Sequence, residues 1–131
     1  MRIFSALCLL AGLILPGAAQ AQEGHPLTGT WSGDWGPNLE EREHLTVVMR
    51  WDGENVTGLI NPGPRSVVLG TVRLDVTDWT VRLEAGARDD SGRSVPIAAE
   101  GRLENLESAH RTLRGTWRQG DRQGGFLLTR D

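Results

Sequence analysis

Short segments in which apolar and polar residues alternate fill most of the chain, and this period of two constrains the fold more than any other feature. Such segments, separated by turn residues, are typical of β sandwiches and barrels, and no stretch repeats with the period of an amphipathic helix. The alternation predicts eight strands, over residues 28–35, 44–51, 55–61, 66–75, 79–87, 94–103, 111–118 and 125–130.

Alternation also divides each strand into two faces, because successive side chains point to opposite sides of a sheet. The faces that collect large apolar residues are the expected core. These faces are Leu45, Val47, Met49 and Trp51 on one strand, Trp79, Val81, Leu83 and Ala85 on another, and Val95, Ile97, Ala99 and Leu103 on a third.

The hairpin around Asp90 has one register that satisfies its charges. Pairing Leu83 with Ala99 brings Arg82 opposite the acidic residue Glu100 on the solvent face. A slip of two residues would instead place two glutamates opposite each other, which is destabilising. We therefore expect the register that pairs Leu83 with Ala99.

Turn residues and glycines predict how the strands are connected. Asp52-Gly53, Asp90-Ser91-Gly92 and residues 120–124 indicate hairpins, and Asn61-Pro62-Gly63-Pro64 indicates a stiff turn. Glycines recur on the apolar faces at Gly29, Gly58, Gly101 and Gly115, where they allow strongly bent strands. Closure of the sheet would remove its two exposed edges. We predict an all-β fold with a single antiparallel eight-stranded up-and-down barrel.

The first 21 residues have the three parts of a secretory signal: Arg2, an apolar run over residues 3–15, and small residues that end at Ala21. We expect cleavage after Ala21 and a single domain over residues 22–131. The apolar run is too short to span a bilayer, so we expect no membrane anchor. Cys8, the one cysteine, falls within the signal. The sequence thus predicts an exported, disulfide-free protein, periplasmic or extracellular.

The charge balance bears on the class of partner. The chain carries 14 basic and 17 acidic residues and a formal net charge of −3. A nucleic-acid-binding surface needs an excess of positive charge to neutralise phosphates. The composition therefore argues against nucleic acid as a partner and favours a small-molecule ligand or an exported protein.

Several motifs resemble the avidin and streptavidin barrels, in the same order along the chain. They are LTGTW at 27–31, DG at 52–53 followed by VTG at 56–58, WTV at 79–81 and FLLT at 126–129. Gly29 and Trp31 on the first strand, with Arg130 on the last, are similar to a signature of the lipocalin-like group. Residues 31–37, 51–53 and 61–64 also resemble an uncharacterised domain of exported bacterial proteins. The resemblance implies a calycin-type barrel.

The residues that hold biotin in the avidins do not carry over to this chain. Gly33 and Pro37 stand where the avidins have an asparagine and a serine, and the chain contains no tyrosine. The tryptophans that enclose biotin fall on Leu83, Leu113 and Phe126. A buried urea ring without matched partners would lose about 1–3 kcal/mol for each unpaired polar atom. We expect no biotin binding.

No constellation of side chains amounts to a catalytic site. Asp34, Glu40, Glu41, Glu43 and His44 lie close in sequence and could supply an acid and a base for sugar hydrolysis. Such a cluster is more often solvated loop charge, and the small barrel offers little of the deep cleft that a glycosidase needs. We expect a protein that is not an enzyme.

Metal and cofactor sites are not expected either. His25, His44 and His110 are far apart in the sequence, and none is paired with another ligand at zinc spacing. The acidic turns lack the alternating oxygen ligands of a calcium loop.

Tryptophan is the most unusual part of the composition, with residues at 31, 35, 51, 79 and 117. Most of these side chains are expected to fill the core, since two phenylalanines cannot pack a barrel. Trp35 ends its strand and enters the long loop 36–43, so it is the best candidate to line a barrel mouth, with Trp51 and Trp31 as further candidates. The first hypothesis is a non-catalytic module that binds a small apolar or carbohydrate ligand.

The alternative hypothesis is a protein-interaction module, such as an inhibitor or accessory subunit of an exported enzyme. Its contact surface would be the loops 36–43 and 61–64, with Pro37, Arg42, Asn61, Pro62 and Pro64 as the candidate contact residues. An enzyme is the third hypothesis, resting on Asp34, Glu43 and His44.

Overall fold

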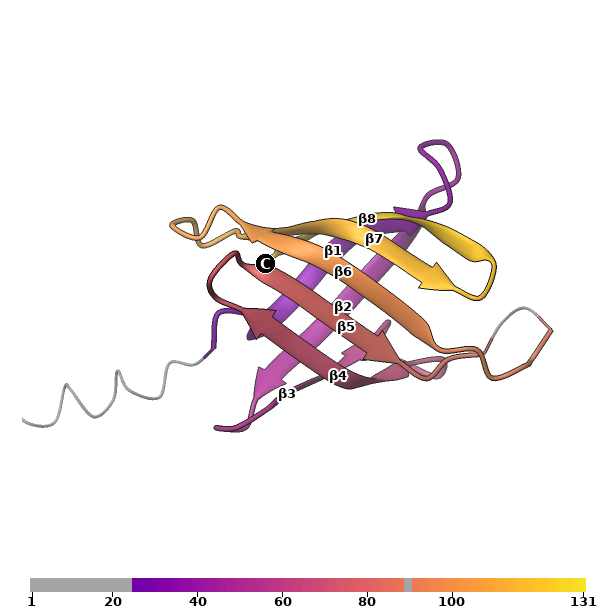
Figure 1. Ribbon diagram of the computed structural model, residues 1–131, viewed down its shortest axis with the longest axis horizontal. Helices are drawn as coiled ribbons and strands as arrows, with labels where there is room; N and C mark the ends of the chain where they lie inside the picture. The colour runs from indigo at the N-terminus through magenta and orange to yellow at the C-terminus, as the bar shows by residue number, and fades with distance from the viewer. Residues whose placement is uncertain (1–24, 89–90) are drawn as a thin grey trace, which may run out of the picture.

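The computed structural model describes residues 25–88 and 91–131, and within them the chain forms eight strands (Figure 1). These are β1 (Gly29–Gly36), β2 (Glu43–Trp51), β3 (Val56–Ile60), β4 (Val67–Asp75), β5 (Thr80–Ala85), β6 (Ile97–Glu104), β7 (Thr112–Gln119) and β8 (Arg122–Arg130). The signal predicted for residues 1–21 lies outside the described residues. The described part of the chain contains no helix that could cross a membrane.

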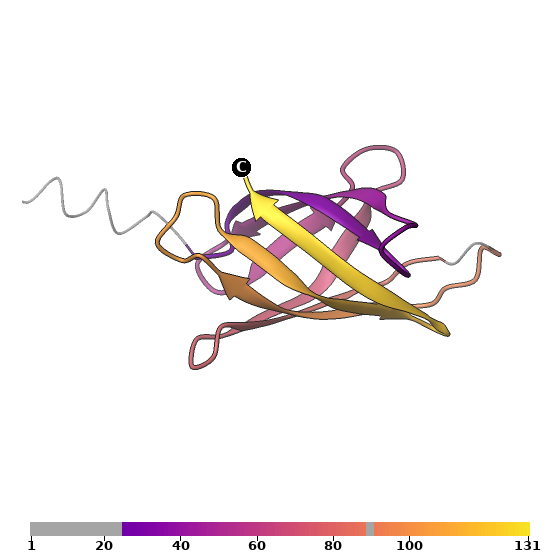
Figure 2. The same ribbon diagram turned by 90° about the horizontal axis from the view of Figure 1, so that it is seen from above.

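The strands form one closed barrel in sequence order. Each strand pairs antiparallel with the next, and β8 pairs with β1 from Trp31 opposite Arg130 to Gly36 opposite Gly125. Figure 2 shows this closure, with β8 in yellow beside β1 in indigo. The predicted all-β, eight-stranded up-and-down barrel is confirmed.

The register of the hairpin between β5 and β6 is the one that the charges predicted. Leu83 lies opposite Ala99 and Arg82 lies opposite Glu100. Arg82 Nε is 3.3 Å from Glu100 Oε2, on the solvent face. Alternation and charge pairing together therefore predicted this register correctly.

The connection between β7 and β8 is shorter than predicted. Gln119 pairs with Arg122, so only Gly120 and Asp121 form the turn, and the glycine takes the left-handed backbone that such a tight turn needs, with φ of 60°. Gly124, expected in the turn, instead belongs to β8. A Cβ atom at Gly124 would lie 1.9 Å from the carbonyl oxygen of Gly36, so the close approach of these strands requires glycine.

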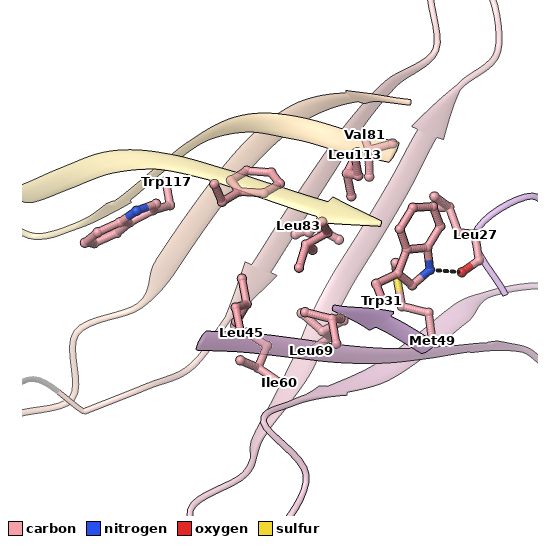
Figure 3. Close-up of a cluster of buried hydrophobic side chains, with 14 of the residues drawn as sticks. Leu27, Trp31, Leu45, Met49, Ile60, Leu69, Val81, Leu83, Leu113 and Trp117 are labelled. Carbon is pink, nitrogen blue, oxygen red and sulfur yellow. Dashed lines mark hydrogen bonds between the residues drawn. The ribbon is translucent and has the colours of Figure 1, made fainter. Parts of the chain in front are cut away.

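The inward faces of the strands form one hydrophobic core (Figure 3). Phe126 fills the space over β6 and β7, where a Cβ at Gly101 would come within 2.9 Å of the phenylalanine ring. Trp51 departs from the predicted core, because it is 40% exposed. It is the last residue of β2, and its ring lies 6.1 Å from that of His25 at the edge of the barrel, beyond the packed interior.

The two ends of the barrel differ, and the up-and-down order of the strands decides which loops meet at each end. The mouth carries the connections β1–β2, β3–β4, β5–β6 and β7–β8. The capped end carries the other three connections, the C-terminus and the segment of residues 25–28, which enters β1.

The segment of residues 25–28 closes the capped end. Leu27 and Trp31 are both fully buried, and the Trp31 Nε1–H donates a 2.9 Å hydrogen bond to the Leu27 carbonyl (Figure 3). Arg111 Nη1 donates to the Pro26 carbonyl at 3.1 Å, and the Leu27 N–H donates to His25 Nδ1 at 3.2 Å. Apolar packing and hydrogen bonds therefore plug this end together.

Candidate functional site

Two tryptophans from different strands meet at the mouth. Trp35 is the penultimate residue of β1 and is half-buried, and Trp117 lies on the inward face of β7. Their ring centroids are 5.1 Å apart at an interplanar angle of 50°. This is a tilted pair at a favourable separation, so the two rings form a joined aromatic surface.

An open cleft of about 590 Å³ lies over this aromatic pair, and its size is that of a small-molecule pocket. Apolar side chains from β4 and from the β5–β6 region complete its floor and walls, and charged side chains of both signs form its rim. The apolar residues are Val67, Ala87 and Ile97, and the charged residues are Glu41, Arg42, Glu43, Arg88 and Arg122.

Trp117 carries a polar group that the fold does not satisfy. Its side chain is 5% exposed, and its Nε1–H has no hydrogen-bond acceptor among the described residues. A buried donor without an acceptor costs about 1–3 kcal/mol. The guanidinium carbon of Arg122 lies 5.8 Å from the Trp117 ring, a cation–π distance, so the indole is in contact with the rim of the cleft.

The interior beneath the tryptophans is almost completely filled. The free space there is about 30 Å³, and it is lined by apolar side chains such as Leu45, Val47 and Leu128. This volume is room for about one or two water molecules, and an apolar cavity of this kind stays dry. Trp35, Trp117 and Ile97 line both spaces, so they separate the core from the mouth.

Gln119 holds one wall of the mouth in place. It follows Trp117 by two residues on the same face of β7 and is buried. Its Nε2 donates a 3.0 Å hydrogen bond to the Val95 carbonyl, and the Val95 N–H donates to Ala87 O at 2.8 Å. These bonds connect β7 to the region between β5 and β6.

The loop of residues 37–42 is fastened by the Arg42 guanidinium. Its Nε donates to Asp34 Oδ1 at 2.9 Å, its Nη2 donates to the Asp34 carbonyl at 3.2 Å, and Nη1 lies 3.4 Å from the carbonyls of Gly36 and Asn38. Asn38 Oδ1 accepts from the backbone N–H groups of Glu40 and Glu41. These bonds fasten the loop to β1 and cross-link it internally.

The structure divides the residues that the sequence proposed for a site between the two ends. Trp35, Pro37 and Arg42 lie at the mouth, and the β3–β4 loop with Asn61, Pro62 and Pro64 lies at the same end. Trp31 and Trp51 lie at the capped end. The three candidate tryptophans therefore do not come together, and the Trp31 N–H is already bonded within the core.

Asn61 has a structural role in its loop. Its backbone is left-handed, with φ of 49°, a conformation that asparagine tolerates better than most residues. Its N–H donates to the Thr46 carbonyl at 2.7 Å, and its side-chain Oδ1 accepts from the Thr46 N–H at 3.0 Å. Asn61 thus continues the β2–β3 ladder by one step.

Sequence reasoning missed three residues of the mouth, Trp117, Gln119 and Arg122. Trp117 was correctly expected on the inward face of its strand, but the sequence did not bring it together with Trp35. The strand predicted over 111–118 ended one residue before Gln119. Extension of the alternation by two residues from Trp117 would have found Gln119 on the inward face. Arg122 was hidden because residues 120–124 were predicted to form the turn.

The candidate acid–base residues are engaged in other contacts. Asp34 pairs with Arg42, and His44 Nε2 lies 3.0 Å from Thr46 Oγ1. Asp34 and His44 are opposite each other in the β1–β2 ladder, on its outer face. Nowhere in residues 25–88 and 91–131 do three His, Cys, Asp or Glu side chains gather as metal ligands would.

Neither a family model, nor a curated protein, nor a solved structure matches the chain. The closed antiparallel barrel is compatible with the calycin-type resemblance of the motifs.

Proposed function

We propose that this chain is an exported, non-catalytic binding module that holds a small ligand, an apolar compound or a carbohydrate, in the cleft at the mouth. The observation that carries the proposal is the Trp35–Trp117 pair beneath a cleft of about 590 Å³ that has apolar walls and a charged rim. The ligand would lie against the exposed part of the Trp35 ring, with the apolar side chains of the cleft around it. Under this proposal, the chain resembles the avidin and lipocalin barrels because it is related to them.

The filled interior limits the shape of the ligand. About 30 Å³ of free space beneath the tryptophans cannot take an acyl chain or a ring, so the ligand lies across the mouth and does not enter the barrel. A flat molecule with one apolar face suits the exposed part of Trp35, and its polar edge would reach the charged rim. Sugar rings and aromatic compounds both have this shape.

Tryptophan fluorescence tests the proposal with one probe from each class, cellotetraose and 8-anilino-1-naphthalenesulfonate. We expect one of the two probes to change the tryptophan emission, and this change should saturate as the probe concentration rises. Trp35→Ala should weaken this binding about tenfold or more, because an aromatic contact in a binding site commonly contributes more than 1 kcal/mol.

Trp51→Ala is the matched control, because Trp51 is a partly exposed tryptophan at the opposite end. It should leave the affinity unchanged. Binding that survives Trp35→Ala, or the lack of saturable binding by either probe, would contradict a ligand site at the mouth.

A second candidate function, contact with an exported protein partner, is favoured by Leu39. Leu39 is 93% exposed and sits in the loop that Arg42 and Asn38 fasten. An apolar side chain on a preorganised loop loses little conformational freedom on binding, which is how interface anchors gain affinity. The neighbouring Glu40 and Glu41 would favour a basic rim on the partner.

Leu39→Ser tests this second candidate in co-purification from the exported fraction of the host. Loss of a partner that wild type retains would support it, whereas equal retention would refute it. Val68→Ser is the control, because Val68 is also an exposed aliphatic residue but lies on the outer face of the barrel.

A further inference from the structure

In the part of the chain that the structure describes, β3 and β4 pair over only part of their lengths, which leaves part of the β4 edge unpaired. Among the described residues, the ladder between β3 and β4 consists of three pairs and ends where Gly58 lies opposite Leu69. The ladder between β4 and β5 continues for the rest of β4, to Asp75 opposite Thr80. Residues 71–75 are therefore paired on one side only.

A bulge explains why β4 leaves β3. The register of β4 shifts between Leu69 and Thr71, and β4 then follows β5 while β3 follows β2 through Val56 and Thr57. The two strands separate toward the capped end in Figure 1. An open edge presents unpaired N–H and C=O groups, which are a template for another strand.

The residues along this edge are complementary to themselves in the antiparallel direction. Residues 72–76 read Val-Arg-Leu-Asp-Val. If the segment is paired with a second copy centred on Leu74, valine meets valine, leucine meets leucine, and Arg73 of each copy meets Asp75 of the partner subunit. Arg73 and Asp75 both point outward and are exposed, and Val76 is 62% exposed at the end of the segment.

The charges around Arg73 favour an acidic neighbour on the open side. Arg73 lies opposite Arg82 in the β4–β5 ladder, and Arg82 is paired with Glu100. No carboxylate of the described residues forms an ion pair with Arg73. Like charges directly opposite in a sheet are destabilising, and an aspartate on the other side of Arg73 would offset this repulsion.

We propose that two copies of this chain associate through their β4 edges, in antiparallel pairing over residues 72–76 about a two-fold axis at Leu74. The neighbouring registers that also place inward-facing side chains opposite each other are less favourable, and a centre on Asp75 would oppose two aspartates. A centre on Arg73 would oppose two arginines, and a centre on Val72 would oppose Arg73 to Thr71 of the partner subunit. Because this part of β4 lies toward the capped end, the mouths of both copies stay open, and the dimer is independent of the proposed ligand site.

The Asp75 side chain is held in place for this contact. Its Oδ1 accepts from the N–H of Thr77 at 2.9 Å and from the Thr77 hydroxyl at 2.5 Å, within the β4–β5 turn. Asparagine would keep this acceptor and lose the charge. The variant Asp75→Asn therefore separates the role of the charge from the role of the turn.

Sedimentation equilibrium of the purified protein tests the proposal, over about 5–500 µM, which brackets the affinity of small transient interfaces. Wild type should show a monomer–dimer equilibrium. Arg73→Asp and Asp75→Arg should each raise the dissociation constant about tenfold, because two attractive pairs become repulsive. The double variant should restore the dimer, since the charges are exchanged in both copies.

Asp75→Asn should weaken the dimer less than Asp75→Arg does, and it covers the case in which the arginine disrupts the turn. Near-ultraviolet circular dichroism checks that each variant is folded. A protein that remains monomeric at about 500 µM, a concentration far above the dissociation constant of most specific contacts, overturns the proposal. So does a dimer that the single charge changes leave intact, or one that the double variant fails to restore.

Discussion

The two ends of the barrel use the same kind of residue in opposite ways. At the capped end, Trp31 is fully buried and its N–H is bonded to Leu27 O at 2.9 Å. At the mouth, Trp117 is also buried but its N–H has no acceptor among the described residues, and Trp35 beside it is half-exposed. A satisfied tryptophan closes the barrel, whereas the unsatisfied one lies under an open cleft.

Because of this difference, we expect the capped end to serve mainly stability and the mouth to serve mainly ligand binding. Core groups with all partners satisfied contribute most to the free energy of unfolding, while sites that must receive a ligand retain exposed apolar area and unpaired donors. The capped end should therefore carry more of the stability, and substitution at the mouth should affect mainly the proposed ligand binding.

Truncation of one tryptophan at each end gives the largest expected difference. Trp31→Ala should lower the free energy of unfolding by about 3–5 kcal/mol, since it leaves a large cavity in a filled core. Trp35→Ala should cost about 1–2 kcal/mol, because part of its ring already faces water. Urea unfolding measures both changes in the free energy of unfolding. Equal losses in the two variants would contradict the expected difference in stability between the two ends.

Replacement of each buried tryptophan by phenylalanine compares the two indole N–H groups more directly. Trp31→Phe removes the hydrogen bond to Leu27 O, whereas Trp117→Phe removes a donor that has no partner within the described part of the chain. Both variants lose ring volume. Trp31→Phe should lower the free energy of unfolding by about 1–3 kcal/mol more than Trp117→Phe does. The pair of unfolding curves measures this difference, and a greater loss in Trp117→Phe would mean that its N–H has an acceptor in solution.

The fastening of the mouth loop is expected to have a smaller effect. Arg42→Ala should lower stability by about 0.5–1 kcal/mol, the size of a partly exposed ion pair. Its main result should be faster hydrogen exchange at Glu40 and Glu41, whose N–H groups bond to Asn38. Arg42→Lys should show the same acceleration, because an ammonium cannot reach Asp34 and the loop carbonyls together. Unchanged exchange would contradict the fastening.

Acid should affect the capped end slightly, through His25. Burial lowers the pKa of His25 from 6.5, so the folded protein favours the neutral ring that accepts the Leu27 N–H. Its contribution to stability is therefore full above pH 6.5 and is lost as the pH falls through the lower pKa of the folded state. Melting temperatures between pH 7.5 and 5 should show a drop that His25→Gln reduces, and an unaltered drop would assign the effect to other groups.

Local patterns were enough to predict the strands. The eight observed strands overlap the predicted ones, and the β5–β6 register followed from Leu83, Ala99 and the charges beside them. Errors arose at the ends of strands, as at Trp51, where alternation gives the side of a side chain but not how far the packed interior extends. They also arose at Gly124, which signals a turn in sequence but is required in β8 by a close approach to β1.

The candidate site was only partly predictable. Trp35 and the loop 36–43 were identified because a strand ends there, yet Trp117 joins Trp35 from β7, and only the position of β8 between their strands brings the two rings together. Alternation could not show that Trp31 and Trp51 lie away from Trp35. The pattern gives the face of the strand that a side chain occupies but not the end of the barrel at which it lies.

The sequence by itself determined the strands, their inward faces and their order around an antiparallel barrel, because these depend on residues close together in the chain. The tertiary structure decided which end is plugged, how full the interior is, and where β4 is left unpaired. These features depend on how strands distant in sequence close around the core, and there steric contacts such as that between Gly36 and Gly124 and the bulge after Leu69 override local preference.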